Sequence, residues 1–157
     1  MAGLFPSLAV HVSDISRMGR AYLTRRVTFA AAHRYHRAEW SDEENQRVFG
    51  ACAWDSYHGH SYTCDVTVRG AIDPVTGFLI DLGELDNILH TEVRSRFDHR
   101  NINVDVPEFG DGGMVPTGEN LARFIFEKIR AAIGNNAEVT SVTVAEDDTL
   151  SATWRIE

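Results

Sequence analysis

The sequence predicts an α+β fold in which a small antiparallel sheet carries two helices on one face. Strands are indicated by alternating or β-branched residues in segments 61–70, 137–147 and 149–157. Helices are indicated by apolar residues at helical spacing in segments 83–97 and 117–134. This order of elements, with strands before and after a helical middle, is typical of an α+β arrangement.

The first predicted elements are a strand and a short helix. Residues 25–35 (RRVTFAAAHRY) have the composition of a strand that ends in polar residues. Ser41 and Glu44 have the spacing of a capping box, and Gly50 suits a helix end. We therefore expect one or two helical turns over 41–50.

The next segment alternates as a half-buried strand does. In residues 61–70, one set of side chains is predicted to face the core and the other to face away from it. The predicted inner set is Tyr62, Cys64, Val66 and Val68. Segment 72–82 has Asp-Pro and Thr-Gly turn signals between two strand-like runs, so it is expected to form a β-hairpin.

Two longer helices are predicted in the second half of the chain. The helical spacing over 83–97 is carried by Leu82, Leu85, Leu89, Val93 and Phe97. A loop with two prolines and three glycines is expected over 98–116. The second helix begins at the capping residue Thr117 and ends at Gly134, and two strands then close the chain.

Length and charge limit the classes of function. The 157 residues suit one domain, expected over 21–157, with residues 1–20 as an N-terminal extension. The formal net charge of −8 argues against non-specific binding to nucleic acids or anionic membranes, which needs basic patches. A local basic pocket for an anionic substrate is compatible with this charge.

Targeting and redox signals are weak. No apolar run approaches the roughly 20 residues that a membrane span needs. Residues 1–20 have no basic residue ahead of their short apolar stretch, unlike a secretory signal. The two cysteines, Cys52 and Cys64, do not make a disulfide framework. We therefore expect a cytoplasmic protein.

Residues 58–60 read His-Gly-His. Side chains two apart point to the same side of a strand, so His58 and His60 are expected to project together. His33 ends the first predicted strand and is a candidate third ligand. Three neutral imidazoles suit a catalytic zinc site with an open fourth position. Two alternatives remain: a chance grouping of surface histidines, and His36 as the ligand in place of His33.

Four further residues carry candidate chemistry. A nearby cation would lower the pKa of the Cys52 thiol and make it a candidate base, although a small buried hydrophobe is the alternative. Asp98 and His99 are adjacent and can tune one another for proton transfer, although such pairs are common on loop surfaces. Glu146 either continues an apolar strand face, where a planar heterocycle would supply N–H donors, or leaves the sheet at the following turn.

Together these stretches resemble the 6-pyruvoyl-tetrahydropterin synthase family, which includes the bacterial 6-carboxytetrahydropterin synthases. The resemblance runs from about residue 25 to the C-terminus. It rests on FAAAHRYH, SDEENQRVFGAC, HGHSYTCDVTVRGAIDPVTGFLIDLGEL, FDHRNIN, PTGEN and the strand that ends in Glu146. The order and combination of these pieces, rather than any one of them, make the resemblance specific.

The resemblance implies a tunnelling fold, in which ββααββ subunits join their sheets into an oligomeric barrel. Family members are commonly hexamers with active sites between subunits, and the implied cofactor is Zn²⁺. The implied zinc ligands are His33, His58 and His60; the implied catalytic residues are Cys52, Asp98 and His99; and the implied pterin-binding residues are Glu146, Thr117 and Glu119.

The implied activity is a zinc-dependent conversion of 7,8-dihydroneopterin triphosphate to 6-pyruvoyl-tetrahydropterin with loss of triphosphate. The redox change is internal, and the chain has no GxGxxG or P-loop motif. The alternative is a 6-carboxy-5,6,7,8-tetrahydropterin synthase acting on the same substrate, toward queuosine and other deazapurines. An aldolase-like cleavage is disfavoured by Cys52, because similar proteins with that activity tend to carry an acid there. A non-catalytic zinc-binding assembly module of the same fold is the remaining alternative.

Some features depart from the family pattern. Trp54 and Tyr57 make the loop before His58 bulkier than expected, and they are predicted to narrow the pocket or change the substrate. Gly118 and the segment FGDGGMVP are also atypical. Candidate contacts for the triphosphate are Arg25, Arg26 and Arg100.

Overall fold

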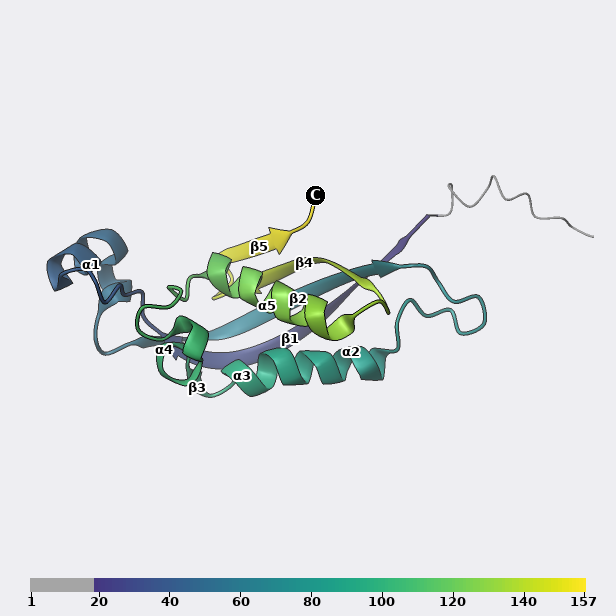
Figure 1. Cartoon of the computed structure of the whole chain (residues 1–157), viewed down its shortest axis with the longest axis horizontal. Coiled ribbons are helices and arrows are strands. Elements are labelled where there is room, and N and C mark those ends of the chain that lie inside the picture. The colour runs from purple at the N-terminus through teal and green to yellow at the C-terminus, as the bar shows by residue number, and fades with distance from the viewer. Residues whose placement is uncertain (1–18) are drawn as a thin grey trace, which may run out of the picture.

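The computed structural model describes residues 19–157, and Figure 1 shows a sheet with helices packed along it. The predicted extension over 1–20 therefore lies outside the described residues, apart from Gly19 and Arg20. Among the helices of residues 19–157, none has the length and apolar character needed to span a bilayer.

Five strands of the described chain form one sheet in the order β3-β1-β2-β4-β5. They are β1 (Ala21–His33), β2 (His58–Gly70), β3 (Arg100–Asn101), β4 (Glu138–Ala145) and β5 (Ser151–Arg155). Neighbouring strands are antiparallel except β3, which pairs in parallel with the end of β1. The α+β prediction is confirmed, and in the single chain the sheet is open rather than closed into a barrel.

The helical segments are α1 (Asp42–Phe49), η2 (Gly50–Ala53), α2 (Leu82–Leu89), η3 (His90–Arg94), α3 (Ser95–Phe97), α4 (Ile102–Asp105), η4 (Pro107–Phe109) and α5 (Gly118–Ile133). A π-helical turn, η3, joins α2 to α3, so the helix predicted over 83–97 forms without a break. The predicted cap of α5 is also confirmed, because Thr117 Oγ1 accepts the N–H of Asn120 at 3.3 Å.

The core lies between the sheet and helices α2 and α5, which lie along it in Figure 1. The predicted inner residues of β2, from Tyr62 to Val68, are each at most 1% exposed. Burial raises the pKa of the Cys64 thiol to about 12, so this cysteine is an inert part of the core. The helix residues that cover this face are Leu85, Leu89, Leu121, Ile125 and Ile129. The opposite face is polar and carries cross-strand pairs such as Arg26–Asp65, 2.7 Å apart.

The β-hairpin predicted over 72–82 is wrong. A turn does form, because Asp73 Oδ1 accepts the N–H of Thr76 at 2.7 Å, but no strand comes after it before α2. The chain after the turn buries Ile80 against the core and reaches Asp81, which caps α2. The apolar residues after the turn therefore do not pair as a strand: Ile80 is buried in the core, whereas Phe78 is 56% exposed.

The loop predicted over 98–116 is also more structured than expected, since it contains β3, α4 and η4. Asn103 in α4 holds this segment to the end of β1. Its Oδ1 accepts the N–H of Arg34 at 2.9 Å, and its Nδ2 donates to the carbonyl of Arg34 at 3.1 Å. A two-residue strand has no periodicity in the sequence, and β3 is defined by its pairing with Ala31 and Ala32 of β1.

Helix α1 and η2 form a projection at one end of the sheet, at the left of Figure 1. The predicted cap is confirmed, because Ser41 Oγ accepts the N–H of Glu44 at 3.2 Å. Asn45, 2% exposed, holds the projection together. Its Oδ1 accepts the N–H of Arg37 at 2.8 Å, and its Nδ2 donates to the Arg37 carbonyl at 3.0 Å. These bonds fix the orientation of α1 relative to the end of β1.

Candidate functional site

Three histidines meet at the end of the β1–β2 pair. His33 faces His58 directly in the antiparallel register, and Ala31 faces His60, so all three imidazoles lie on the inner face. One ring nitrogen from each residue lies within 4.8 Å of the others. The Nε2 atoms of His33 and His58 are 3.1 Å apart. The predicted grouping is present, whereas His36 lies apart from it and lines another cavity beside Trp54.

The orientation of His33 is fixed by its other ring nitrogen. Its Nδ1 lies 2.9 Å from the carbonyl oxygen of Pro116, which is an acceptor only, so Nδ1–H donates to it. This tautomer leaves Nε2 with a free lone pair that faces His58. The hydroxyl of Tyr62 lies 3.0 Å from His33 Nδ1. The Tyr62 ring is perpendicular to the His33 ring, with 5.8 Å between the centroids.

Two of these histidines, His33 and His58, have lowered pKa values. Burial, with the neighbouring histidines His58 and His60, lowers the pKa of His33 to about 4, although the Pro116 carbonyl opposes this shift. Burial and His60 also lower the pKa of His58. At neutral pH, His33 therefore has the neutral form that binds metal ions.

One ring nitrogen in the cluster lacks a hydrogen-bond partner. Among residues 19–157, His60 Nε2 is buried and has no hydrogen-bond partner, and a buried polar atom of this kind is costly to leave unpaired. Glu146 Oε2, at 3.8 Å, is too far away to satisfy it. A metal ion between the three rings would satisfy it, and three imidazoles suit several transition metals. The cluster can therefore hold a metal ion.

A cavity of about 340 Å³ lies next to the histidine cluster, because Glu146, which lines it, is 3.8 Å from His60. It is lined by Tyr35, Val48, Phe49, Thr117, Gly118, Glu119, Val144, Glu146, Leu150, Ser151 and Ala152. The three residues predicted to bind a pterin ring, Glu146, Thr117 and Glu119, therefore share one cavity. Gly118 is atypical but fits closely, because a Cβ there would lie 3.3 Å from Ala152 Cβ.

Glu146 lies one residue beyond the end of β4, at the start of the following turn, so it has left the strand as the alternative expected. Its side chain nevertheless keeps the inner side of the sheet and is only 6% exposed. The Tyr35 hydroxyl donates to Glu146 Oε1 at 2.9 Å. Burial first, and then Glu146, raise the pKa of Tyr35, so its hydroxyl remains a donor.

Cys52 lies in η2 and is not among the residues that line the cavity of Glu146. Its carbonyl accepts the N–H of Tyr35 at 2.8 Å, which fixes the backbone beside the cavity. Burial and the negative charge of Glu146 raise the pKa of the Cys52 thiol. In the protein alone, without a cation nearby, Cys52 is therefore a protonated thiol.

Asp98 and His99 are paired but face elsewhere. Asp98 Oδ1 accepts the backbone N–H of Ala30 at 2.9 Å and lies 3.1 Å from His99 Nδ1. The Ala30 N–H is the main reason that the pKa of Asp98 is lowered, and His99 adds to it. The His99 side chain is 84% exposed and lines a recess with His60, Ser61 and Arg100, whereas neither Cys52 nor Glu146 lines that recess. One chain does not bring all the predicted catalytic residues together.

The bulky loop before His58 does not narrow the cavity of Glu146. Trp54 is 59% exposed and is absent from the cavity lining. The ring of Tyr57 packs against the guanidinium of Arg34, 5.3 Å from its centroid. Tyr35 and Phe49 also line the cavity of Glu146, although no motif in the sequence indicated them. Tyr35 has the same parity as His33 along an extended chain, which is the signal that would have found it.

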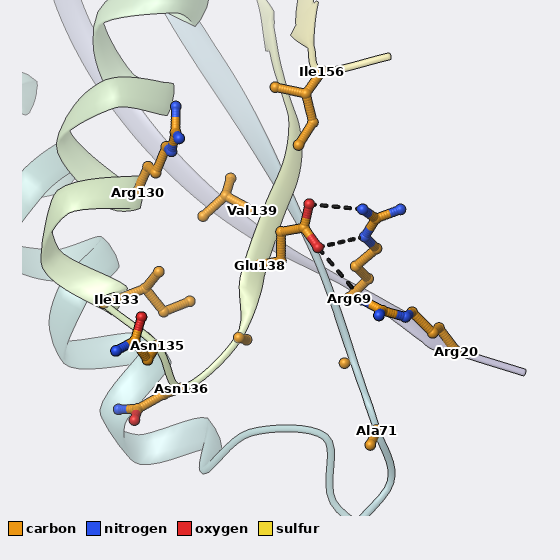
Figure 2. Close-up of a pocket in the computed structure, with 13 residues that line it drawn as sticks. Arg20, Arg69, Ala71, Arg130, Ile133, Asn135, Asn136, Glu138, Val139 and Ile156 are labelled. Carbon is orange, nitrogen blue, oxygen red and sulfur yellow. Dashed lines mark hydrogen bonds and ion pairs between the residues drawn. The ribbon is translucent and has the colours of Figure 1, made fainter. Parts of the chain in front are cut away.

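A second cavity, of about 440 Å³, lies at the far end of β2 from the histidines (Figure 2). There Arg69 binds Glu138 through two 2.7 Å hydrogen bonds, and Arg20 lies 3.6 Å from the same carboxylate. None of the predicted site residues lines it. Arg20 and Arg69 are therefore both paired with Glu138.

Comparison with known proteins supports the resemblance. A family model described as 6-pyruvoyl tetrahydropterin synthase matches residues 22–157. The chain belongs to the 6-pyruvoyl tetrahydropterin synthase family. The histidine cluster and the cavity of Glu146 both lie within the matched region.

The similar relatives include synthases and one aldolase. The 6-pyruvoyl tetrahydrobiopterin synthase of Poecilia reticulata is 44% identical over 71% of this chain and 75% of its own length. That of Homo sapiens is 38% identical over 74% of this chain and 79% of its own length. A dihydroneopterin monophosphate aldolase of Pyrococcus furiosus is 29% identical over 59% of this chain and 73% of its own length.

The solved structures agree with the fold. The 6-pyruvoyl tetrahydropterin synthase of Caenorhabditis elegans matches with a TM-score of 0.82 and 34% identity, covering 89% of this chain and 98% of that chain. A protein of Wolinella succinogenes, 17% identical, matches with a TM-score of 0.67 over 89% of this chain and 100% of that chain, which shows the fold alone.

The histidine cluster of this family member predicts which substitutions remove metal. We expect His60→Ala to lose most bound metal after loading and dialysis, because two remaining imidazoles make an incomplete site. His36→Ala is the matched control and is expected to keep the wild-type content. Elemental analysis by mass spectrometry measures both. Full metal content in His60→Ala, or its loss in His36→Ala, would contradict the assignment.

Proposed function

We propose that this chain is a zinc-dependent lyase that converts 7,8-dihydroneopterin triphosphate to 6-pyruvoyl-tetrahydropterin with loss of triphosphate. The observation that carries the proposal is the 3.8 Å approach of His60 Nε2, in the histidine cluster, to Glu146 Oε2, in the cavity. It joins a candidate metal site to a candidate ring-binding site. Relatives at 38–44% identity are named for this activity.

His33, His58 and His60 are the proposed ligands of Zn²⁺. Three neutral imidazoles with an open fourth position make a catalytic zinc site. When bound, zinc supplies Lewis-acid polarisation of the hydroxyls on the substrate side chain. The bond from His33 Nδ1 to Pro116 orients the ligand, as such second contacts commonly do in metal sites.

Glu146 is the proposed anchor of the pterin ring. A carboxylate that is 6% exposed needs hydrogen-bond donors, and a pterin presents neighbouring N–H groups on one edge. Thr117 and Glu119, at the start of α5, offer further polar contacts in the same cavity. Phe49 and Leu150 add apolar lining that suits the faces of a planar ring.

Cys52 is the proposed acid–base group that moves protons between the ring and the side chain of the substrate. Burial and the negative charge of Glu146 both raise the pKa of the Cys52 thiol. A cation bound nearby would oppose this shift and favour the thiolate. The redox change stays within the substrate, and the triphosphate leaves by elimination. No nicotinamide or flavin is required by this balance.

Asp98 and His99 are proposed to act on substrate bound to a neighbouring subunit. His99 is exposed and lies apart from the cavity of its own chain. The sheet also has edges that assembly would cover, since β3 pairs with only Ala31 and Ala32 of β1 and β5 is the outermost strand. We therefore propose a homo-oligomer with shared active sites, and the resemblance to the family implies that it is a hexamer built on a barrel.

The remaining parts of the proposal concern partners and location. The partner is a small pterin triphosphate rather than a nucleic acid, in keeping with the net charge of −8. The cytoplasm is the proposed compartment, because Cys52 and Cys64 are both free thiols.

Product analysis tests the proposed function directly. Zinc-loaded protein is incubated without oxygen with 7,8-dihydroneopterin triphosphate, and the products are identified by mass spectrometry. We expect 6-pyruvoyl-tetrahydropterin and free triphosphate. A 6-carboxy product would assign the chain to the alternative synthase, and a 6-hydroxymethyl product would assign it to the aldolases. Unchanged substrate would contradict an enzymatic role on this compound.

Mixed oligomers test the shared active site. Cys52→Ala and His99→Ala are each expected to lower turnover at least about 100-fold, the usual scale for losing an acid–base group. Unfolding and refolding the two variants together should restore about a quarter of wild-type activity, because that share of randomly mixed interfaces is intact. The control is each variant refolded alone. If the mixture stays as inactive as its components, sharing between subunits is wrong.

A further inference from the structure

Tyr35 is a residue of the cavity to which neither the motifs nor the proposed chemistry assigns a role. It lies two residues beyond His33, just after β1. Its hydroxyl donates to Glu146 Oε1 at 2.9 Å, across 111 residues of sequence. It is the one hydrogen-bond donor to this carboxylate within residues 19–157. Glu146 Oε2 remains open to a ligand.

The ring of Tyr35 is held on two sides. It packs edge-on against His33, with 5.1 Å between the ring centroids, and against Phe49, with 5.9 Å between them. Phe49 in turn stacks on Trp40 at 5.6 Å. Because these contacts restrict the ring, the hydroxyl points at Glu146 before any ligand arrives.

The backbone of Tyr35 belongs to the same arrangement. Its N–H donates to the Cys52 carbonyl at 2.8 Å, so the residue that contacts Glu146 also fixes the chain at Cys52. One position therefore connects the proposed ring anchor with the proposed proton-transfer residue. A charged acceptor strengthens the hydroxyl bond relative to a neutral one.

We propose that Tyr35 is a positioning residue for ring binding: its hydroxyl holds the Glu146 carboxylate in the orientation that receives the pterin N–H groups. This inference rests on the proposed function and deepens it. Preorganising a binding group avoids the cost of ordering it when the ligand arrives. Tyr35 accordingly acts on ring affinity through Glu146 and takes no part in proton transfer.

Tyr35→Phe tests this role, because it removes the hydroxyl and keeps the ring contacts to His33 and Phe49. We expect KM for the triphosphate substrate, and the Kd of the ring probe 7,8-dihydroneopterin, to rise about tenfold. We expect kcat to stay within about twofold and zinc content to stay unchanged. Tyr22→Phe, on the opposite face of the sheet, is the matched control and should match wild type.

A double-mutant cycle shows whether Tyr35 acts through Glu146. Once Glu146→Ala has removed the acceptor of the Tyr35 hydroxyl, adding Tyr35→Phe should change the Kd of 7,8-dihydroneopterin by less than about twofold. Fully additive losses would overturn the inference, because they would mean that Tyr35 contributes to binding independently of Glu146.

The remaining outcomes separate this inference from the proposed function. If wild type binds and turns over substrate while Tyr35→Phe matches it, the role of Tyr35 is wrong and the function stands. A large fall in kcat at unchanged KM would also overturn the inference, because it would place Tyr35 in the chemistry. Wild type that neither binds the ring nor turns over the triphosphate would overturn the function and this inference with it.

Discussion

The register between β1 and β2 is the constraint on which the site depends. His33 faces His58, and His60 lies on the same face opposite Ala31. A slip of one residue would turn the histidines of one strand to the opposite face of the sheet. Phe29 and Tyr62 resist that slip, because they are paired in this register, stack with centroids 4.8 Å apart, and are at most 3% exposed. Packing of this core pair therefore fixes the register that brings the three histidines together.

Segments distant in sequence complete the site at this end of the sheet. Pro116 orients His33, and the start of α5 follows at once with Thr117. Glu146 comes from the end of β4, and Cys52 from the turn after α1. Asp98 holds the exposed side chain of His99 at a recess separate from the cavity that Glu146 lines. This division is the physical reason to propose a shared site in an oligomer.

Local chemistry predicted most of the fold. Ser41 and Thr117 cap the helices that they were expected to cap, and the alternation through Tyr62 identified the buried face of β2. The turn signals in 72–82 predicted a turn correctly and the flanking strands wrongly, because turn residues do not specify the structure of the segments beside them. Among site residues, the histidine grouping followed from strand parity. The bond between Tyr35 and Glu146 could not be predicted, since it joins elements that only the fold brings together.

The proposed metal ligands are the imidazoles of His33, His58 and His60, and not the thiol of Cys52. X-ray absorption at the zinc edge of the loaded protein tests this assignment most directly, because nitrogen and sulfur ligands lie at different distances from zinc. We expect nitrogen or oxygen neighbours at about 2.0–2.1 Å and the imidazole scattering pattern of His33, His58 and His60. A sulfur neighbour at about 2.3 Å would make Cys52 a ligand and contradict its role as the free acid–base group.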